Sequence, residues 1–480
     1  MQPERPGHLQ LRAVNLISDP VHGYIELTKR LAPEQARALG LGSEDAAEGD
    51  LLDSAWLQRM RRVSQLQSAR WVFPSAEHSR FQHSIGAMHV AGRFARHLYA
   101  SLTEIVPDCP SENFIEELLR VTALVHDIGH GPFGHFFDDN FLAQYGITHE
   151  ILGQYIIRDE LGSLIRRIRR SPSGPFGRGE EINPDHVAFL ILKDPQKNSA
   201  KYPPWLVFLQ PILGGIYTAD NMDYVLRDSY MCGVAVGPVD IRRLIHYTFF
   251  TDKGLTLHKT GLSALQMFLN TRLYLYSNVY YHRTTRAIDL HLRDIFHDTI
   301  RRIFPYHPIK RRSEYLQLTE WSLLEEIRRW KRSSDAKKRK LYDEWQLIFH
   351  RDVKWKMAYD ITLPTRGGER GRTFLEQETV ERRIREQLPA SLKKLPFKVD
   401  MANQDPRPLN PLSMGEFQIY VYDPSTKVVS KEILREYFDF IPAKIVQCRI
   451  FTLNHEHDAE MARAAERVLG TEAPSSPTNL

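Results

Sequence analysis

The sequence is poor in cysteine and has no long apolar run. Its 480 residues include only 3 cysteines, Cys109, Cys232 and Cys448, and their wide spacing argues against a disulfide framework or a cysteine zinc site. No segment approaches the roughly 18 consecutive apolar residues that a membrane helix requires. The first residues also lack the apolar core of a secretory signal. We therefore expect a cytoplasmic protein with no membrane partner.

The excess of basic over acidic residues is small overall, but one segment is strongly basic. The net charge is only +5, and the 42% hydrophobic and 26% charged residues are ordinary for a globular protein. Between Arg328 and Lys340, however, most residues are basic and only Asp335 is acidic. Such a run can contact nucleic acid or nucleotide phosphates, although a solvated helix face is its more common explanation.

The N-terminal two thirds of the chain are mainly helical in pattern. Residues 1–52 are expected to hold a short hairpin near 13–26 and a surface insertion at 28–49, which is rich in Ala, Glu and Gly. Residues 53–302 follow helical periods and are expected to form the main helical core.

The remainder of the chain changes character. Residues 303–400 are expected to form a charged helical region. Residues 401–470 are expected to form a small α+β module, with strands near 417–422 and 444–453 around a helix near 430–437. A disordered tail is expected at 471–480. The fold class predicted is therefore mainly α, with an N-terminal hairpin and a C-terminal α+β module.

A histidine and an aspartate stand together at the end of an apolar run. His126 and Asp127 follow the mostly apolar residues 118–125 and precede the glycine-rich residues 128–135. Imidazole nitrogen and carboxylate oxygen both bind borderline or hard divalent ions. A single pair is weak evidence, because helix ends often carry polar residues.

Other residues strengthen the case for a metal site. His83 stands near the start of a long helical stretch. Asp220, Tyr224 and Asp228 are spaced at i, i+4 and i+8, which places them on one face of a helix. Carboxylates on such a face, beside apolar neighbours, indicate a polar cavity within a helical bundle.

These residues resemble a known family. The set His83, His126, Asp127 and Asp220 is similar to the four metal ligands of the HD-domain phosphohydrolases. Further stretches resemble the dNTP triphosphohydrolase branch, which includes bacterial dGTPase-like enzymes and a vertebrate protein with SAM and HD domains; they are residues 19–23, 53–61, 65–66, 72–74 and 80–86. The motifs follow the family's order along most of the chain. The resemblance implies that residues 53–302 form an HD-domain helical bundle.

The resemblance also implies a cofactor and a catalytic set. The four ligands would hold one divalent ion tightly, and a second ion would bind with the substrate phosphates; the N and O donors suit Mn, Fe, Mg or Zn. His130 and His149 would line the phosphate pocket, while His135 and Asp138 would form an acid/base pair at the α-phosphate. A histidine held by a carboxylate is a sensible general acid for a leaving 5′-oxygen. Capping of a helix N-terminus is the alternative role for Asp138.

Substrate contacts are expected from a stripe of cations and aromatics. Arg272, Tyr276, Tyr280 and Arg283 share one helix face, where arginine can clamp phosphate and an aromatic ring can pack on a sugar or base. Core packing is the more common explanation of such a stripe on its own. The resemblance implies that it belongs to a substrate pocket, and the implied binding residues are Arg80, Gln65, Leu66, Tyr224, Asp228, Arg272, Tyr276, Tyr280 and Tyr281.

The resemblance assigns parts of the substrate to these residues. Arg80 and Arg272 would bind phosphates beside Tyr224. Tyr280 would crowd the ribose 2′ position and so disfavour ribonucleotides, and Gln65 and Asp228 would bind the 3′-hydroxyl.

The chain departs from the family at three positions. Asn221 replaces a lysine that contacts phosphate, and Tyr281 replaces a glutamine that helps to recognise the base, so the preferred base is open. Asn15 replaces a lysine that binds an activating nucleotide. Asp53, Gln58 and Arg61 nevertheless match residues that recognise a guanine activator, although they can equally form a structural salt-bridge network.

The leading hypothesis is metal-dependent hydrolysis of deoxynucleoside triphosphates to deoxynucleoside and inorganic triphosphate, with or without an allosteric nucleotide. An HD-type nuclease, or a phosphohydrolase of another nucleotide, is the alternative enzyme. A nucleotide sensor or nucleic-acid-binding scaffold is the non-catalytic alternative, against which the complete set of ligand and acid/base residues argues. By analogy with relatives, a homo-oligomer is expected, either a tetramer or a hexamer.

Overall fold

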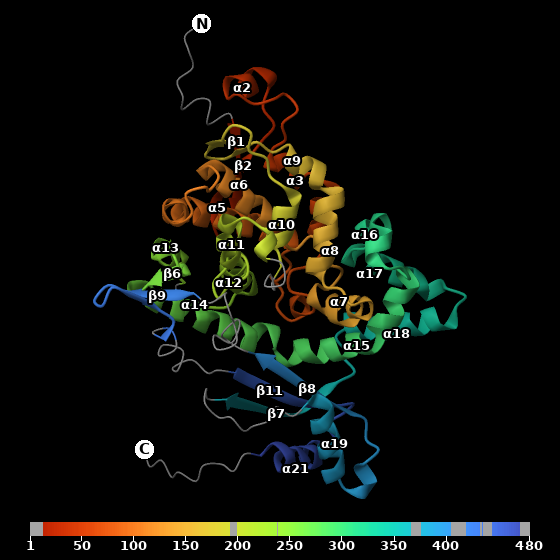
Figure 1. Ribbon diagram of the computed structural model, residues 1–480. Helices are drawn as coiled ribbons and strands as arrows, with labels where there is room; N and C mark the ends of the chain where they lie inside the picture. Colours follow the sequence, from red (N-terminus) through yellow and green to blue (C-terminus); the bar gives the residue numbers. More distant parts are fainter. Residues whose placement is uncertain are drawn as a thin grey trace.

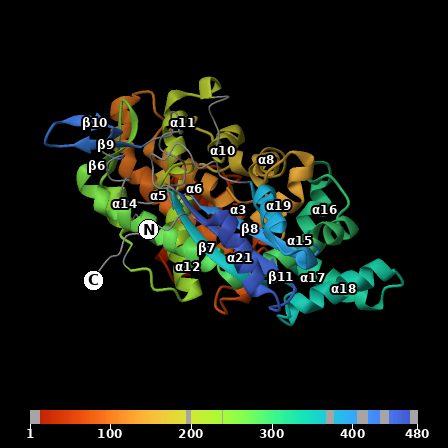
Figure 2. The same cartoon turned by 90° about the horizontal axis from the view of Figure 1, so that it is seen from below.

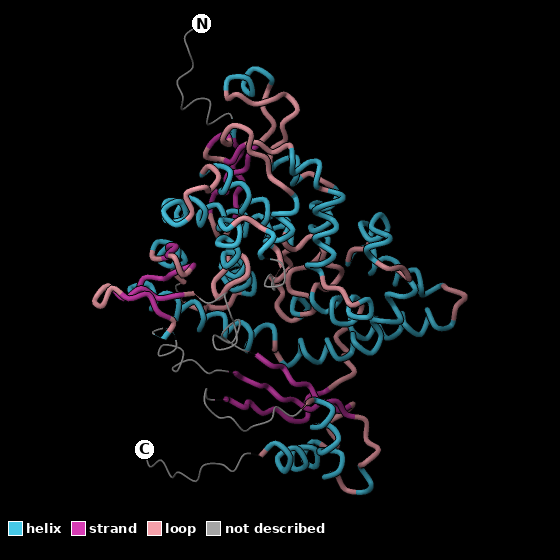
Figure 3. The backbone as a smooth tube through the Cα atoms, in the orientation of Figure 1, coloured by secondary structure: helices cyan, strands magenta, loops and turns pink. Residues whose placement is uncertain are grey.

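Helices make up most of the protein. The computed structural model describes residues 13–192, 199–237, 239–365, 376–404, 419–432, 434 and 444–470. Within these residues the strands gather in separate small sheets, as the tube drawing in Figure 3 shows. The predicted fold class, mainly α with an N-terminal hairpin and C-terminal α+β structure, is confirmed.

Three helices form the centre of the molecule (Figure 1): α5 (Arg80–Ile105), α6 (Glu112–Val125) and α12 (Ala219–Cys232). Helix α5 packs against both of the others. Its buried side chains recur at helical spacing and include Phe81, Ile85, Met88, Ala91 and Leu98. Gly86 permits the close approach of α12, because a Cβ atom at that position would lie 1.8 Å from Asp223 Oδ1.

The other helices surround this centre. The N-terminal ones are α2 (Pro33–Ala38), α3 (Glu48–Leu52), α4 (Ala55–Arg59), α7 (His135–Asn140), α8 (His149–Tyr155), α9 (Gly162–Arg166), α10 (Pro184–Leu190) and α11 (Pro204–Leu209). The later ones are α13 (Ile241–His246), α14 (Leu262–Leu275), α15 (Arg283–Ile303), α16 (Arg312–Gln317), α17 (Glu320–Arg329) and α18 (Ala336–Phe349). Most of the buried apolar side chains of these helices join one continuous core.

The expected hairpin is present and ends in a tight turn. Strands β1 (Val14–Asp19) and β2 (Gly23–Thr28) pair antiparallel, with Asp19 opposite Gly23. Asp19 Oδ1 closes the turn by accepting hydrogen bonds from the backbone N–H groups of Val21 and His22, both at 2.9 Å. This turn points His22 toward the helical core.

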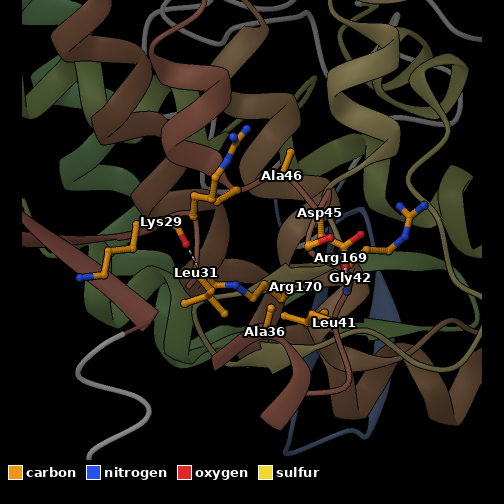
Figure 4. Close-up of a pocket in the computed structure, with 12 residues that line it drawn as sticks. Lys29, Leu31, Ala36, Leu41, Gly42, Asp45, Ala46, Arg169 and Arg170 are labelled. Atoms are coloured by element: carbon orange, nitrogen blue, oxygen red, sulfur yellow. Dashed lines mark hydrogen bonds between the residues drawn. The ribbon is translucent and has the colours of Figure 1, made fainter. Parts of the chain in front are cut away.

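The stretch expected as a surface insertion, residues 28–49, is anchored in the core at both ends. Thr28 and Glu48 are fully buried. Glu48 accepts a hydrogen bond from Thr28 N at 2.8 Å and pairs with Arg120 Nε at 2.6 Å, because a buried carboxylate needs a charged partner. Figure 4 shows a small pocket that is lined by residues of this stretch together with Arg170. Only the middle of the stretch is therefore a surface insertion.

The two predicted C-terminal strands belong to different sheets. Strand β9 (Tyr420–Asp423) lies between β10 (Val428–Ser430) and β6 (Gly254–His258), in a sheet completed by β5 (Thr248–Thr251). It pairs parallel with β6, which comes from the middle of the chain. The expected single module is thus corrected, since its first strand joins the helical core instead.

The second strand forms a sheet that begins before residue 401. Strand β11 (Lys444–Thr452) lies between β7 (Lys356–Thr365) and β8 (Phe397–Gln404), antiparallel to both. The expected boundary at 401 therefore falls within β8, and the expected charged helical region supplies two strands. The helix expected near 430–437 falls largely outside the described residues, and the tail expected at 471–480 falls entirely outside them.

Helices α19 (Gln377–Gln387) and α21 (Asp458–Leu469) cover the face of this sheet that points away from the helical core (Figures 1 and 2). Together they enclose a second, smaller core, which includes Val380, Ile384, Val399, Ile450 and Met461. The two short strands β3 (Arg170–Ser171) and β4 (Gly174–Pro175) pair after α9, and both residues of β3 are buried. None of the described helices is both long and apolar enough to cross a membrane.

Candidate metal centre and active site

Three potential metal ligands converge at the centre of the helical core. His83 lies on α5, His126 directly follows α6, and Asp220 lies in the first turn of α12. Their ligand atoms all lie within 4.8 Å of one another. Asp220 Oδ1 is 3.0 Å from His83 Nε2 and 3.7 Å from His126 Nε2. The start of α12 is fixed there by Thr218, whose hydroxyl accepts a hydrogen bond from Asn221 N at 3.0 Å.

Asp127, the fourth predicted ligand, lies beside the same atoms. Its Oδ1 is 3.3 Å from His126 Nε2, and its Oδ2 is 3.9 Å from His83 Nε2. Arg80 Nη1 donates to the same Oδ2 at 2.5 Å. Burial alone would raise the pKa of Asp127, but His126 and Arg80 hold it well below its usual value. The carboxyl is therefore ionised, as a metal ligand must be.

This donor set fits a divalent metal. His126 Nδ1 donates to the carbonyl of Ala123 at 2.7 Å, which leaves the lone pair on Nε2. Among the described residues, this buried Nε2 has no hydrogen-bond partner. Two imidazoles and two carboxylates suit Mn, Fe, Mg or Zn, and nothing in the donor set selects one of them.

His83 is held from behind by a carboxylate that the sequence analysis missed. Its Nδ1 lies 2.8 Å from Asp223 Oδ2, and Asp223 Oδ1 lies 2.7 Å from His22 Nε2. Arg227 donates to both oxygens of Asp223, at 2.9 and 2.8 Å, and to Asp19 Oδ2 at 2.8 Å. A carboxylate in this position fixes the orientation of a ligand histidine and makes it more basic.

The pKa of His83 reflects this support. Burial alone would lower the pKa, but hydrogen bonds to Asp220 and Asp223 raise it to about 10. The sequence carried two signals of the arrangement. Asp223 follows Asp220 by about one helical turn, and the stretch from Asp19 to Gly23 resembles the corresponding stretch of the family.

Replacing His22 by alanine is expected to weaken metal binding about 10-fold to 100-fold, the usual effect of removing an outer partner of a ligand histidine. The check is metal content after dialysis against a graded series of chelator concentrations. His89→Ala is the matched control, because the His89 ring lies 5.3 Å from that of His22 but makes no hydrogen bond with Asp223 among the described residues. Equal metal retention in the two variants would contradict the expectation.

A second group of titratable side chains lies next to the first. His130, His135, Asp138 and His149 each offer a ligand atom within 4.8 Å of the others. Asp138 Oδ2 is at their centre, 2.5 Å from His149 Nδ1, 3.5 Å from His135 Nδ1 and 3.8 Å from His130 Nδ1. Burial raises the pKa of Asp138, but the histidines more than offset this and hold it well below normal. The predicted contact of His135 with Asp138 exists, yet His149 is the closer partner.

His130 connects the two groups. It is fully buried and stacks on His149, with 3.6 Å between ring centroids. Its Nε2 lies 3.4 Å from Asp127 Oδ1, and neither ring nitrogen makes a hydrogen bond within the described residues. Burial, followed by the charge of Arg80, lowers the pKa of His130 well below its usual value, so the ring is neutral.

A cavity of about 410 Å³ opens onto both groups. The predicted site residues that line it are Gln65, Leu66, Arg80, His126, Asp127, His135, His149, Asp220, Tyr224, Asp228, Tyr276, Tyr280 and Tyr281. The volume falls in the range of small-molecule sites. His83, His130, Asp138 and Arg272 lie behind these residues, and Arg272 Cζ is 5.7 Å from the ring centroid of Tyr276.

Polar atoms in the cavity wall and directly behind it differ in whether they already have hydrogen-bond partners. Tyr280 Oη donates to Asp228 Oδ2 at 2.6 Å, and His78 Nε2 lies 2.8 Å from Asp228 Oδ1, so both oxygens of this carboxylate are engaged. In contrast, the hydroxyl of Tyr224 and Nη1 of Arg272 are buried without a hydrogen-bond partner among the described residues. Buried polar atoms are rarely left so, which points to a polar ligand at this end of the cavity.

The C-terminal sheet contacts the wall of the cavity. Arg449, on β11, donates through Nη1 to the carbonyl of Tyr281 at 2.5 Å. Arg286, which also lines the cavity, is paired with Asp400 of β8 through Nε at 2.9 Å. The sheet thus positions residues at the end of the cavity where the base was expected.

The three residues expected to bind an activator do not form a salt-bridge network with one another. Arg61 Nε donates to Gln58 Oε1 at 2.9 Å, and its guanidinium lies 3.7 Å from the ring centroid of Phe81. Asp53 follows α3 and makes no ion pair within the described part of the chain. None of the three lines the cavity described above.

The HD domain family matches residues 80–189, which carry three of the four predicted metal ligands and the second histidine group. The chain contains an HD domain. The family described as the HD associated region matches residues 239–358. The HD-domain resemblance seen in the sequence is therefore confirmed, and the match supports a metal-dependent phosphohydrolase.

Relatives extend the comparison beyond the HD domain. The chain is 26% identical over 341 residues to the uncharacterized protein YwfO of Bacillus subtilis, covering 68% of this chain and 69% of that protein. It is 26% identical over 319 residues to the deoxynucleoside triphosphate triphosphohydrolase SAMHD1 of Gallus gallus, covering 59% of this chain and 45% of that protein. The HD-domain chain spans about half the length of the SAMHD1 relatives that it matches.

A hypothetical protein from Aquifex aeolicus has a crystal structure with the same fold. It is 22% identical, with a TM-score of 0.64, and the superposition covers 95% of this chain and 100% of that one. The likeness therefore extends well beyond the HD domain match at residues 80–189.

Proposed function

We propose that this HD-domain protein hydrolyses deoxynucleoside triphosphates to deoxynucleoside and inorganic triphosphate. The observation that carries the proposal is the meeting, in one cavity, of a metal-ligand set with a carboxylate-bound histidine group. Similarity to proteins named deoxynucleoside triphosphate triphosphohydrolases supports the substrate class.

His83, His126, Asp127 and Asp220 are proposed to hold the divalent ion. Bound there, the ion would lower the pKa of a water molecule and neutralise charge on a phosphoryl group. The proposed ligands come from α5, from the two residues that follow α6, and from α12, so their mutual placement is fixed by tertiary packing. This rigidity favours catalysis, because the site need not reorganise when substrate binds.

The chain's own groups are proposed to bind the phosphates and to supply a proton. Arg80 faces the cavity beside Asp127, and Arg272 lies behind Tyr276 with an unpaired Nη1. Arginine is suited to phosphate because its planar group donates two parallel hydrogen bonds. His135 and His149, both in contact with Asp138, are the candidates to protonate the leaving 5′-oxygen.

The aromatic wall is proposed to select the sugar. Tyr280 is held by its hydrogen bond to Asp228, so its ring is fixed at the cavity surface. A fixed ring crowds a ribose 2′-hydroxyl, whereas a deoxyribose has only a hydrogen in its place. Gln65 and Asp228, which line the same cavity, would bind the 3′-hydroxyl, and each oxygen of Asp228 can accept a further hydrogen bond beside its present one.

Product analysis tests the proposal. The purified protein is incubated with Mn or Mg and each dNTP, singly and in pairs, and the products are identified by chromatography. Intact inorganic triphosphate together with deoxynucleoside is the expected result. Single nucleotides report the base preference, and a rate increase when two nucleotides are present reveals an activating nucleotide.

An HD-type nuclease is the second candidate, and the basic run at the C-terminal end of α17 and in α18 favours it. Side chains there are strongly exposed, with Arg328 at 76% and Arg329 at 70%. Such a surface attracts nucleic acid through its charge. Shortened single strands, with no triphosphate released from dNTPs, would establish the nuclease and reject the leading proposal.

A further inference from the structure

A larger cleft lies outside the HD cavity. It has a volume of about 830 Å³ and is open to solvent. Its walls come from the turn of the β1–β2 hairpin, the middle of α5 and the start of α13. None of the predicted metal, catalytic or activator residues lines it.

Basic side chains dominate this cleft. Arg93 and Arg96 lie one turn apart on α5, and Arg242 faces them from α13. Arg96 pairs with Glu116 at 3.2 Å, but Arg93 and Arg242 pair with no carboxylate among the described residues. Asp240 also lines the cleft, where its Oδ1 accepts a hydrogen bond from the backbone N–H of Arg243.

The surroundings confirm that the positive charge is poorly compensated. Burial, and then the nearby charges of Arg242 and Arg96, lower the pKa of Arg93. His89, half-buried between these arginines and His22, has its pKa lowered to about 3 by burial and by the neighbouring cations. Like charges held together in a concave site are costly unless an anion accompanies them.

We propose that this cleft binds an oligophosphate anion through Arg93, Arg96 and Arg242. Three guanidinium groups offer paired donors to several phosphate groups at once, which matches a chain of phosphates better than a single carboxylate. The volume accommodates either inorganic triphosphate or the phosphates of a nucleotide. Tyr24, which is 69% exposed at the edge of the cleft, offers a ring to a base in the second case only.

The cleft also shares a residue with the support of the metal centre. His22 lines it and contacts Asp223, which in turn holds His83. An anion in the cleft therefore lies at the outer end of a hydrogen-bonded chain that ends on a predicted metal ligand.

Calorimetric titration with inorganic triphosphate tests the proposal, because this probe carries no nucleoside to be released. The unmodified chain is compared with Arg93→Gln/Arg242→Gln, and binding at the cleft is expected to weaken about tenfold or more when two charged donors are lost. Arg328→Gln/Arg329→Gln is the matched control, since it removes the same charge from an exposed helix end elsewhere. Equal affinity and stoichiometry in both double variants would overturn the proposal.

Two further measurements sharpen the result. Arg93→Lys/Arg242→Lys keeps the charge and is expected to retain more of the affinity than the glutamine variant, at an unchanged melting temperature; equal loss in both would show a structural effect and reject the site. Titration with a nucleoside triphosphate in which a methylene group replaces the 5′-oxygen distinguishes the sources, because the bond proposed to break is absent from it. If Tyr24→Ala weakens the binding of this nucleotide but not of inorganic triphosphate, the ligand of the cleft is a nucleotide. If the variant binds both probes as tightly as the unmodified chain does, the ligand is the inorganic anion.

Discussion

Asp127→Ala is expected to abolish both metal retention and turnover. The carboxylate lies beside both ligand histidines and is held in its ionised form by His126 and Arg80. A catalytic metal contributes several kcal/mol to the stabilisation of transition-state charge, so the rate is expected to fall on the order of 10³-fold or more. Metal content by elemental analysis and initial rates with Mn in excess are the two measurements.

The nature of the replacement separates charge from packing. Asp127→Asn keeps the volume and one acceptor for Arg80 but removes the negative charge, and it is expected to lose metal as completely as the alanine variant. Asp298→Asn, an exposed carboxyl on α15, removes the same charge at a distance and is expected to behave like the unmodified chain. Turnover in Asp127→Ala comparable with that of Asp298→Asn would remove the metal mechanism proposed above.

The proposed metal centre was expected from several motifs taken together and not from one local pattern. His126 and Asp127 are adjacent, which alone is weak evidence, and the family resemblance implied His83 and Asp220 as the other two ligands. Their support was not predictable in the same way. His22 reaches Asp223 across 201 positions of the sequence, and only tertiary packing brings a hairpin turn to the back of His83.

The second histidine group shows the same division. The family resemblance implied His135 and Asp138 as an acid/base pair. The structure adds His149, whose Nδ1 is 1.0 Å closer to Asp138 Oδ2, at 2.5 Å against 3.5 Å for His135. His149 lies in the first turn of α8, whereas His135 lies on α7 together with Asp138. No local sequence pattern shows which of the two imidazoles lies closer to Asp138.

Strand order in the C-terminal part was beyond the sequence for a similar reason. Alternating apolar residues indicated the strands near 417–422 and 444–453, but alternation does not show with which other strand each of them pairs. Strand β9 found its partner in β6, at Thr256 to His258, far earlier in the chain. Strand β7 was not expected, because it follows the charged helix α18 and residues 303–400 as a whole have the composition of charged helices.

Asp138→Asn is expected to reduce kcat about 10²-fold to 10⁴-fold while metal content stays unchanged. Asp138 is not among the four proposed metal ligands, yet its Oδ2 is shared by His149 and His135. Removing its charge leaves both imidazoles without the partner that orients them and stabilises their protonated form. Rates and metal content measured on the same preparation separate this variant from Asp127→Ala, which loses both.

The dependence on the leaving group then shows whether a proton is delivered. General acid catalysis matters most when the departing oxygen is strongly basic, as a 5′-alkoxide is, and least for an aryl oxide. Asp138→Asn, His135→Ala and His149→Ala are therefore compared on a dNTP and on an α-aryl triphosphate ester. A variant that has lost the acid is expected to be impaired far less on the aryl ester. The histidine whose removal reproduces the selective defect of Asp138→Asn is the proton donor, whereas equal impairment on both substrates in all three variants would show that the group binds phosphate and donates no proton.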